Sequence, residues 1–227
     1  MNMCVSYNAG EFGDFIRYFC GLHTGQVKKE QIYFEMQQRM SDYLKMHLIM
    51  LNPYKNIQID KKVDKEEFIK LFESKCPPPA THIYKVRLRA RDARFKNYHD
   101  QYTHNILGTP EYDIIHSLGH KVIWTNLEVL SAWGVFLLNR KELLYSHWNM
   151  PFDREWYTEY YRKPKNYPKH YLNHIVQIDE LLDYNEDEYN KLIKFLDCKP
   201  MDDWKELITE YRNWIVKDFE KPLDNTT

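Results

Sequence analysis

The chain has 227 residues, of which 43% are hydrophobic and 15% aromatic, and its formal net charge is −1. This composition predicts a folded protein with a sizeable core and excludes a disordered chain. So small a net charge gives no overall field that would draw the chain to nucleic acid or to a membrane surface. Any charged partner must therefore be met by a local patch.

The four cysteines are scattered and form no CxxC pair or zinc-binding pattern; they are Cys4, Cys20, Cys76 and Cys198. We expect reduced thiols and a cytoplasmic location. No apolar run approaches the roughly 20 residues that cross a bilayer, so no membrane partner is expected. Because the first predicted strand begins almost at Met1, we also expect no signal peptide.

The amino-terminal stretch predicts a strand over 3–7, a glycine-containing loop over 8–14, and then a helix that Gly25 ends. Strand, loop and helix in this order can hold a phosphate, because backbone N–H groups and a helix N-terminus converge on one anion. Three of the seven glycines lie in the first 21 residues. Their backbone freedom would suit such a loop.

The next segments predict two helices, over 27–52 and 61–75, the second with Asp64 as its N-cap. Prolines 77–79 stop the second helix, and residues 82–88 alternate as a strand does. This strand leads into a concentrated basic run, made up of Arg87, Arg89, Arg91 and Arg94. The run is either a phosphate or sulfate site or a solvated surface paired with nearby acids.

Residues 98–108 contain His99 and His104, and either ring is a candidate general base because imidazole titrates near neutral pH. Both residues are equally consistent with a polar loop. A short helix is predicted over 111–117, followed by a buried strand over 121–126. A helix over 127–144 with Asn126 as its cap would place another loop at the carboxyl edge of the sheet, where ligands bind in open α/β folds.

Residues 145–168 are dense in aromatic and charged side chains and predict an extended or partly helical lobe. Such interleaving can grip a ring or a base, or it can form an irregular packed surface. The chain then predicts a strand over 174–178, helices over 186–196 and 202–217, and a frayed tail.

The last third of the chain resembles the closing segment of sulfotransferase-fold proteins, in which a strand leads to two helices joined by an FL-x-x-x-P turn, here Phe195, Leu196 and Pro200. The amino-terminal loop resembles the phosphosulfate loop of the same family, in the form seen in small sulfotransferase-like proteins of marine phages. Residues 121–133 resemble the strand and helix whose junction binds the 3′-phosphate of the cofactor.

The resemblance implies a single α/β domain of the P-loop sulfotransferase type over 1–227, with a mainly parallel central sheet flanked by helices. It implies transfer of a sulfuryl group from 3′-phosphoadenosine 5′-phosphosulfate (PAPS) to a hydroxyl or amine of a small molecule or glycan. Arg17 or an arginine of the run 87–94 would neutralise the developing charge, and His104 or else His99 would act as base. The cofactor would be bound by Gly10, Glu11, Phe12, Gly13, Asp14, Phe15, Asn126 and Ser131, without a metal or nucleic acid.

The chain departs from the family pattern at the cofactor loops. The first loop carries Glu11 and Asp14 and no cation, and these acids would repel a phosphosulfate unless Arg17 offsets them. Thr125 stands where the family has an arginine, and the late glycine-rich loop has no clear counterpart.

Two alternatives to the transferase stay open. One is a non-catalytic virion or host-interaction protein that keeps the fold and meets a protein partner through residues 145–171. The other is a P-loop kinase, which is disfavoured because G-x-x-x-x-G-K-[ST] does not occur.

Overall fold

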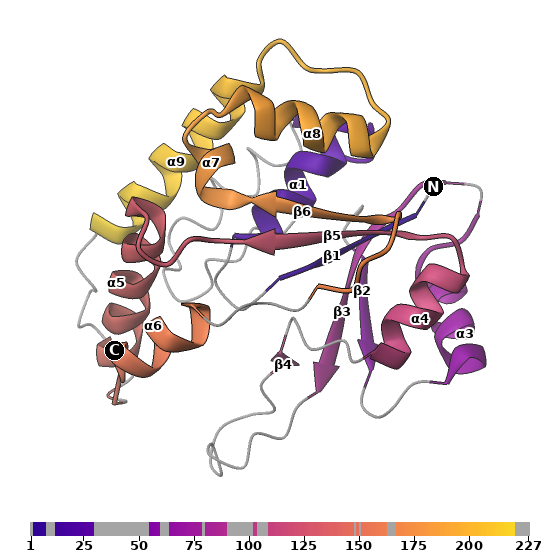
Figure 1. Ribbon diagram of the computed structural model, residues 1–227, viewed down its shortest axis with the longest axis horizontal. Coiled ribbons are helices and arrows are strands. Elements are labelled where there is room, and N and C mark those ends of the chain that lie inside the picture. The colour runs from indigo at the N-terminus through magenta and orange to yellow at the C-terminus, as the bar shows by residue number, and fades with distance from the viewer. Residues whose placement is uncertain are drawn as a thin grey trace.

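The structure, a computed structural model, describes residues 2–7, 12–29, 55–59, 64–78, 80–89, 102–103, 109–147, 149, 151–162 and 167–220. These residues form an α/β fold, in which a mainly parallel sheet is flanked by helices on both faces (Figure 1).

The sheet has β1 (Met3–Ser6) at its centre, between β3 (Ile83–Arg89) and β5 (Lys121–Asn126), and β6 (Asn173–Gln177) beyond β5. These four strands are all parallel and lie in the order β3-β1-β5-β6. Numbered by their sequence within this set of four, the order is 2-1-3-4. β2 (Lys55–Ile59) extends the sheet in parallel beyond β3, and the two-residue β4 (Tyr102–Thr103) pairs with β3 in the antiparallel sense. β1 is covered by helices on both faces, and all four of its residues are buried. Its sequence therefore does not alternate between buried and exposed residues, as a strand with one solvated face would.

The helices divide between the two faces of the sheet, following the alternation of side chains along each strand. One face, carrying Val5 and Ile123, packs against a larger set of helices: α1 (Gly13–His23), α5 (Ala132–His147), α7 (Ile178–Leu182), α8 (Glu186–Leu196) and α9 (Trp204–Glu220). The opposite face, carrying Cys4 and Val122, packs against α3 (Lys65–Lys75) and α4 (Thr109–Ser117). α6 (Arg154–Arg162) lies against α5.

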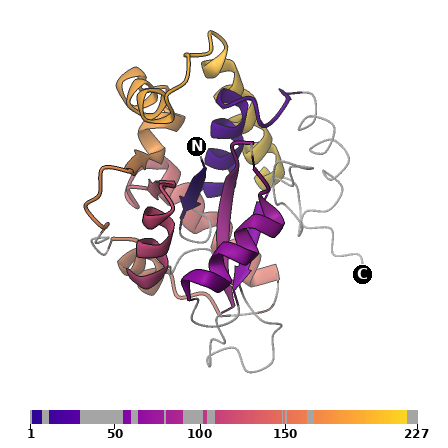
Figure 2. The ribbon, with the colours of Figure 1, turned by 90° about the vertical axis from the view of Figure 1, so that its right-hand side faces the viewer.

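The side view shows α1 beside α9 (Figure 2). Their contact is a pair of stacked rings, Phe15 and Tyr211, with centroids 4.0 Å apart. Both rings are buried, so the helix after β1 is fixed against the carboxyl-terminal helix as well as against the sheet.

Several sequence predictions are confirmed. β5 and α8 have the predicted bounds, and α3 has Asp64 as its N-cap, whose carboxylate accepts a hydrogen bond from the Glu67 amide at 2.8 Å. The first strand and helix are also present, and Gly25 follows α1 with a positive φ of 71°. The predicted helix over 27–52 lies, beyond Lys29, outside the described residues.

The predicted start of the helix after β5 is wrong. α5 begins at Ala132, because residues 127–131 form a turn whose last residue caps the helix: the Ser131 hydroxyl accepts a hydrogen bond from the Gly134 amide at 3.1 Å. Asn126 is therefore not the cap, and its amide instead donates to Gln177 at 2.7 Å, which joins the ends of β5 and β6. β2 was not predicted from the sequence.

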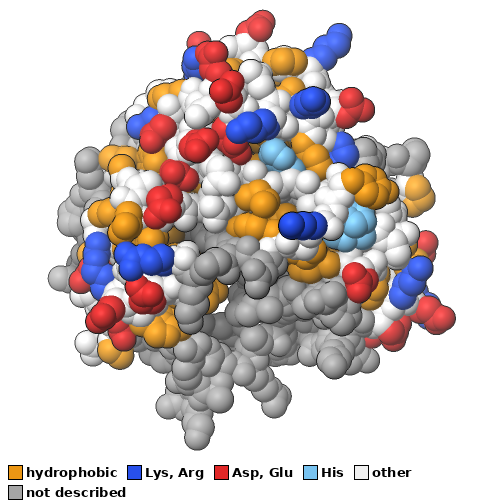
Figure 3. All heavy atoms as spheres, in the orientation of Figure 1, with side chains coloured by type: hydrophobic (Ala, Val, Ile, Leu, Met, Phe, Trp, Pro, Cys, Tyr) orange, Lys and Arg blue, Asp and Glu red, His pale blue; other side chains and the backbone are white. Residues whose placement is uncertain are grey.

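The carboxyl-terminal helix continues to Glu220 and so includes the first four residues of the segment 217–227, which was expected to fray. Among the described residues, none of the helices combines the length and the apolar character that a membrane crossing requires. Acidic and basic side chains are interspersed over the coloured part of the face seen in Figure 3.

We predict that Gly134→Ala destabilises the protein, although alanine is the better helix former. A β-carbon at this position would lie 2.4 Å from the carbonyl oxygens of both Glu128 and Val129, so the preceding turn would have to move. The expected loss is about 1–3 kcal/mol of unfolding free energy, measured by urea denaturation. Val135→Ala, at the exposed neighbouring position, is the control and should change stability by less than about 0.5 kcal/mol. Equal stability of the two variants would contradict this account of the turn.

Candidate functional site

The carboxyl edge of the sheet between β1 and β5 is the place where the strand order reverses. The chain leaves β1 toward β3 and β2 on one side, and leaves β5 toward β6 on the other. In open α/β sheets the crevice outside such a reversal is where ligands bind. Tyr7, which follows β1, and the start of α1 lie at this point, whereas residues 8–11 of the predicted anion loop lie outside the described residues.

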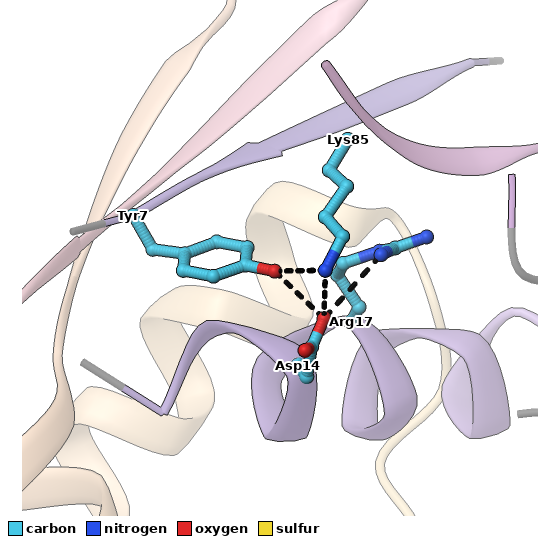
Figure 4. Close-up of polar contacts among 4 residues, drawn as sticks. All are labelled: Tyr7, Asp14, Arg17 and Lys85. Carbon is cyan, nitrogen blue, oxygen red and sulfur yellow. Dashed lines mark hydrogen bonds and ion pairs between the residues drawn. The ribbon is translucent and has the colours of Figure 1, made fainter. Parts of the chain in front are cut away.

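Four side chains meet beside the first turn of α1, and we call them the Asp14 cluster: Tyr7, Asp14, Arg17 and Lys85 (Figure 4). The Lys85 ammonium donates to the Asp14 carboxylate at 2.7 Å and also to the Tyr7 hydroxyl. The Tyr7 hydroxyl donates to the same carboxylate oxygen at 2.7 Å, and Arg17 lies 3.4 Å from it. One carboxylate oxygen of Asp14 thus contacts three donors: Lys85 from β3, Tyr7 from the end of β1 and Arg17 from α1.

The local structure explains how these groups come so close. The ring of Tyr7 lies directly on Gly13, where a β-carbon would come within 1.9 Å of it. Gly13 is thus required by this close approach, whereas the left-handed backbone at the start of α1 is taken by Phe12, with φ 54° and ψ 19°. Phe12 offers no side-chain cap, so its side chain does not satisfy the first N–H groups of α1.

The two cations of the cluster hold Asp14 in its ionised form. Burial alone would raise the pKa of Asp14, but Lys85 and Arg17, with the hydrogen bonds from Lys85 and Tyr7, outweigh burial and hold that pKa well below its usual range. The side chains of Lys85 and Arg17 are fully buried, while that of Asp14 is 18% exposed. Two cations and one carboxylate give these four side chains a summed charge of +1 at neutral pH.

The structure brings together only some of the residues predicted for the site. Arg17 lies 3.4 Å from the Asp14 carboxylate, which is the pairing that the sequence analysis considered as an offset for the loop acids. Phe12 and Phe15 are buried core side chains, against Trp133 and Tyr211 respectively. Gly10, Glu11, His99 and His104 lie outside the described residues.

Asn126 and Ser131, predicted to contact a 3′-phosphate, follow the end of β5. The hydroxyl of Ser131 donates to the Glu128 carbonyl at 2.7 Å and caps α5, and the amide of Asn126 is bound to Gln177. Both polar groups therefore already have protein partners, which a phosphate would have to replace.

Sequence reasoning missed Lys85 and Tyr7. In the sequence Lys85 is one residue of an alternating strand, two positions after Ile83. Because side chains alternate with a period of two, Lys85 shares the face of Ile83, which packs in the α1-side core. A charged residue at a core-facing strand position was the available signal, although its partner could not be identified without the sheet register.

Within the described ranges, no three His, Cys, Asp or Glu side chains are arranged to hold a metal ion. Comparison with protein-family models, with curated proteins and with solved structures found no match to this chain.

We predict that Asp14→Asn strongly destabilises the protein, by about 3 kcal/mol or more, because it leaves two buried cations without the carboxylate that they share. The measurement is urea denaturation at pH 7, and Glu142→Gln is the control. Glu142 makes an exposed ion pair with Arg154, which should contribute no more than about 1 kcal/mol.

The pH dependence gives a second readout of the same variant. A carboxylate whose folded pKa is depressed stabilises the fold fully above its ordinary pKa, and this effect is lost progressively as the pH falls from the ordinary pKa through the folded value. The wild type should therefore lose stability below about pH 4 more steeply than Asp14→Asn. Parallel curves in this range would show that the Asp14 carboxylate contributes nothing.

Proposed function

We propose that the protein binds a phosphosulfate nucleotide at the carboxyl edge of β1 and β5, and that it transfers the sulfuryl group of PAPS to a hydroxyl or amine. The observation that supports this most is the position of Lys85. The first loop lacks the cation that the resembled family carries there, and the Lys85 ammonium reaches the first turn of α1 from the neighbouring strand β3.

The proposed binding has a simple electrostatic basis. The N-terminus of α1 carries a partial positive charge, which favours an anion close to it. The Asp14 cluster adds a summed charge of +1 beneath it. Asp14 itself then acts as the group that holds Lys85 and Arg17 in place, and the acid in the loop ceases to be an obstacle to an anion.

The proposed transfer is an in-line displacement, for which positioning and charge stabilisation supply most of the rate. The acceptor oxygen or nitrogen forms a bond to sulfur while the bond from sulfur to the phosphate oxygen breaks. The acceptor proton goes to His104 or His99, and the leaving 3′-phosphoadenosine 5′-phosphate keeps the electron pair. Lys85 and Arg17 would stabilise the charge on that leaving group, and Asn126 and Ser131 would bind its 3′-phosphate.

A second candidate function, the non-catalytic interaction protein, is supported by the surface of α6. Trp156 and Tyr160 are 41% and 37% exposed, and their rings stack with centroids 5.3 Å apart. Paired exposed aromatic rings are typical of protein-binding surfaces. If nucleotide binding fails, this surface becomes the first place to look for a function.

Calorimetry with 3′-phosphoadenosine 5′-phosphate tests the proposal, and the expected dissociation constant is micromolar. Adenosine without phosphate should bind at least about 100-fold more weakly, since the phosphates supply the ionic contacts. Absence of binding at millimolar nucleotide would overturn the proposal in favour of the interaction protein. Binding that requires magnesium would point to a kinase instead.

We predict that Glu11→Gln tightens binding of 3′-phosphoadenosine 5′-phosphate by about three- to tenfold. The substitution removes a negative charge from the loop that would receive the anion. Repulsion between two unit charges about 4 Å apart costs about 1 kcal/mol in water and more near a protein surface. Glu142→Gln on α5 removes the same charge elsewhere and should leave the affinity unchanged. If both substitutions change the affinity equally, or if neither changes it, the nucleotide does not bind at this loop, even where binding itself is observed.

A further inference from the structure

A short segment before β6, residues 167–172, lies along the α4 side of the sheet, and we call it the strap. The ring of His170 in the strap stacks on the ring of His116 in α4, with centroids 3.9 Å apart and planes 6° from parallel. Tyr171, which is 84% exposed, also stacks on His170, with ring centroids 4.7 Å apart. Two stacked imidazoles thus join the strap to the last turn of α4.

The strap also covers the carboxyl-terminal part of β5. The hydroxyl of Tyr167 donates to the Thr125 carbonyl at 3.0 Å, and the ring of Tyr167 lies edge-on to Trp124 at 5.0 Å. The indole N–H of Trp124 is buried and has no hydrogen-bond partner among the described residues. Closing the strap therefore keeps a donor from water, which makes the closed state less favourable.

The hydrogen bonds define where each histidine carries its proton. Asn173 donates from its amide nitrogen to the Pro168 carbonyl, so its amide oxygen faces His116 and accepts from Nε2 at 2.8 Å. In His170, Nδ1 accepts a hydrogen bond from the Leu172 amide at 3.2 Å. The neutral form of each ring therefore carries its proton on Nε2. Protonating His170 must place a hydrogen on Nδ1, which breaks its bond to Leu172.

The stack also makes a second positive charge unfavourable. Burial lowers the pKa of His116, and repulsion from His170 lowers it further, while the hydrogen bond to Asn173 and the charge of Asp113 act in the opposite direction. Asp113 lies one turn earlier on α4, and Lys169 lies next to His170 in the strap. A released strap would free His116 from the stack and from burial, so in the released state its pKa rises and it takes up a proton more readily than in the closed state.

We propose that residues 167–172 form an acid-released strap: protonation of the His116–His170 pair detaches the strap from α4 and exposes Trp124 at the carboxyl end of β5. The two states differ in bound protons, so falling pH shifts the population toward the released state. A difference of one pKa unit between the states corresponds to about a tenfold change in the opening constant. This device is independent of nucleotide binding.

The test is ¹⁹F NMR of the full chain labelled with 5-fluorotryptophan, with the Trp124 resonance assigned by Trp124→Phe. Between pH 7.5 and pH 5 we expect the Trp124 resonance to shift toward its solvent-exposed position. We also expect hydrogen exchange of the strap amides, corrected for the intrinsic pH effect, to rise about tenfold. The scan ends at pH 5 because burial holds the pKa of His120 and of His174 at about 4, so both rings stay neutral.

The double variant His116→Phe/His170→Phe keeps the stacked rings but cannot take up protons, and it should show no transition. His82→Phe removes a histidine on the loop before β3 and should leave the transition unchanged. A transition that persists in the double variant, or a wild-type strap that stays protected at pH 5, would overturn the proposal. Loss of far-UV circular dichroism at the same midpoint would also overturn it, since the event would then be global unfolding.

Discussion

The carboxylate of Asp14 is the group on which the arrangement at the carboxyl edge depends. A lysine at a core-facing position of a central strand is unfavourable unless its charge is paired and hydrogen-bonded. Asp14 supplies that pairing and at the same time holds Arg17, so one oxygen ties α1 to β3. Asp14 and Lys85 are therefore one structural feature, because each charge stabilises the other in a buried position.

The sequence predicted those elements whose signals are local. Asp64 followed by an amphipathic run identified α3, and the apolar run between polar residues identified β5. The start of α5 was missed because Leu127 and Val129 are buried in the turn just as they would be in a helix, so the apolar pattern is the same in both. The distinguishing residue is Gly134, whose missing β-carbon makes room for the turn, and that reason is visible only in three dimensions.

The same distinction between local and distant contacts explains what could be predicted of the site. Asp14 and Arg17 are three residues apart on one helix, and the sequence already suggested that they meet. Lys85 is 71 residues from Asp14, and only the pairing of β1 with β3 brings them together. In the sequence, Tyr7 shows only that a strand ends there. Its role in the site is visible in the structure, where its ring leaves no room for a β-carbon on Gly13.

Two sets of polar contacts, one on each face of the sheet, begin at neighbouring residues where β1 ends. Tyr7 faces the Asp14 cluster on the α1 side, while the hydroxyl of Ser6 is hydrogen-bonded to Tyr112 of α4 at 2.9 Å on the other side. Tyr112 in turn contacts Trp124 and stacks loosely on His116. A released strap would remove His170 and Tyr167 from these contacts but leave Tyr112 anchored to Ser6. Protonation on the opposite face should therefore leave the contacts of Asp14 unchanged, because pairing with β3 and β5 holds β1 in register on both sides.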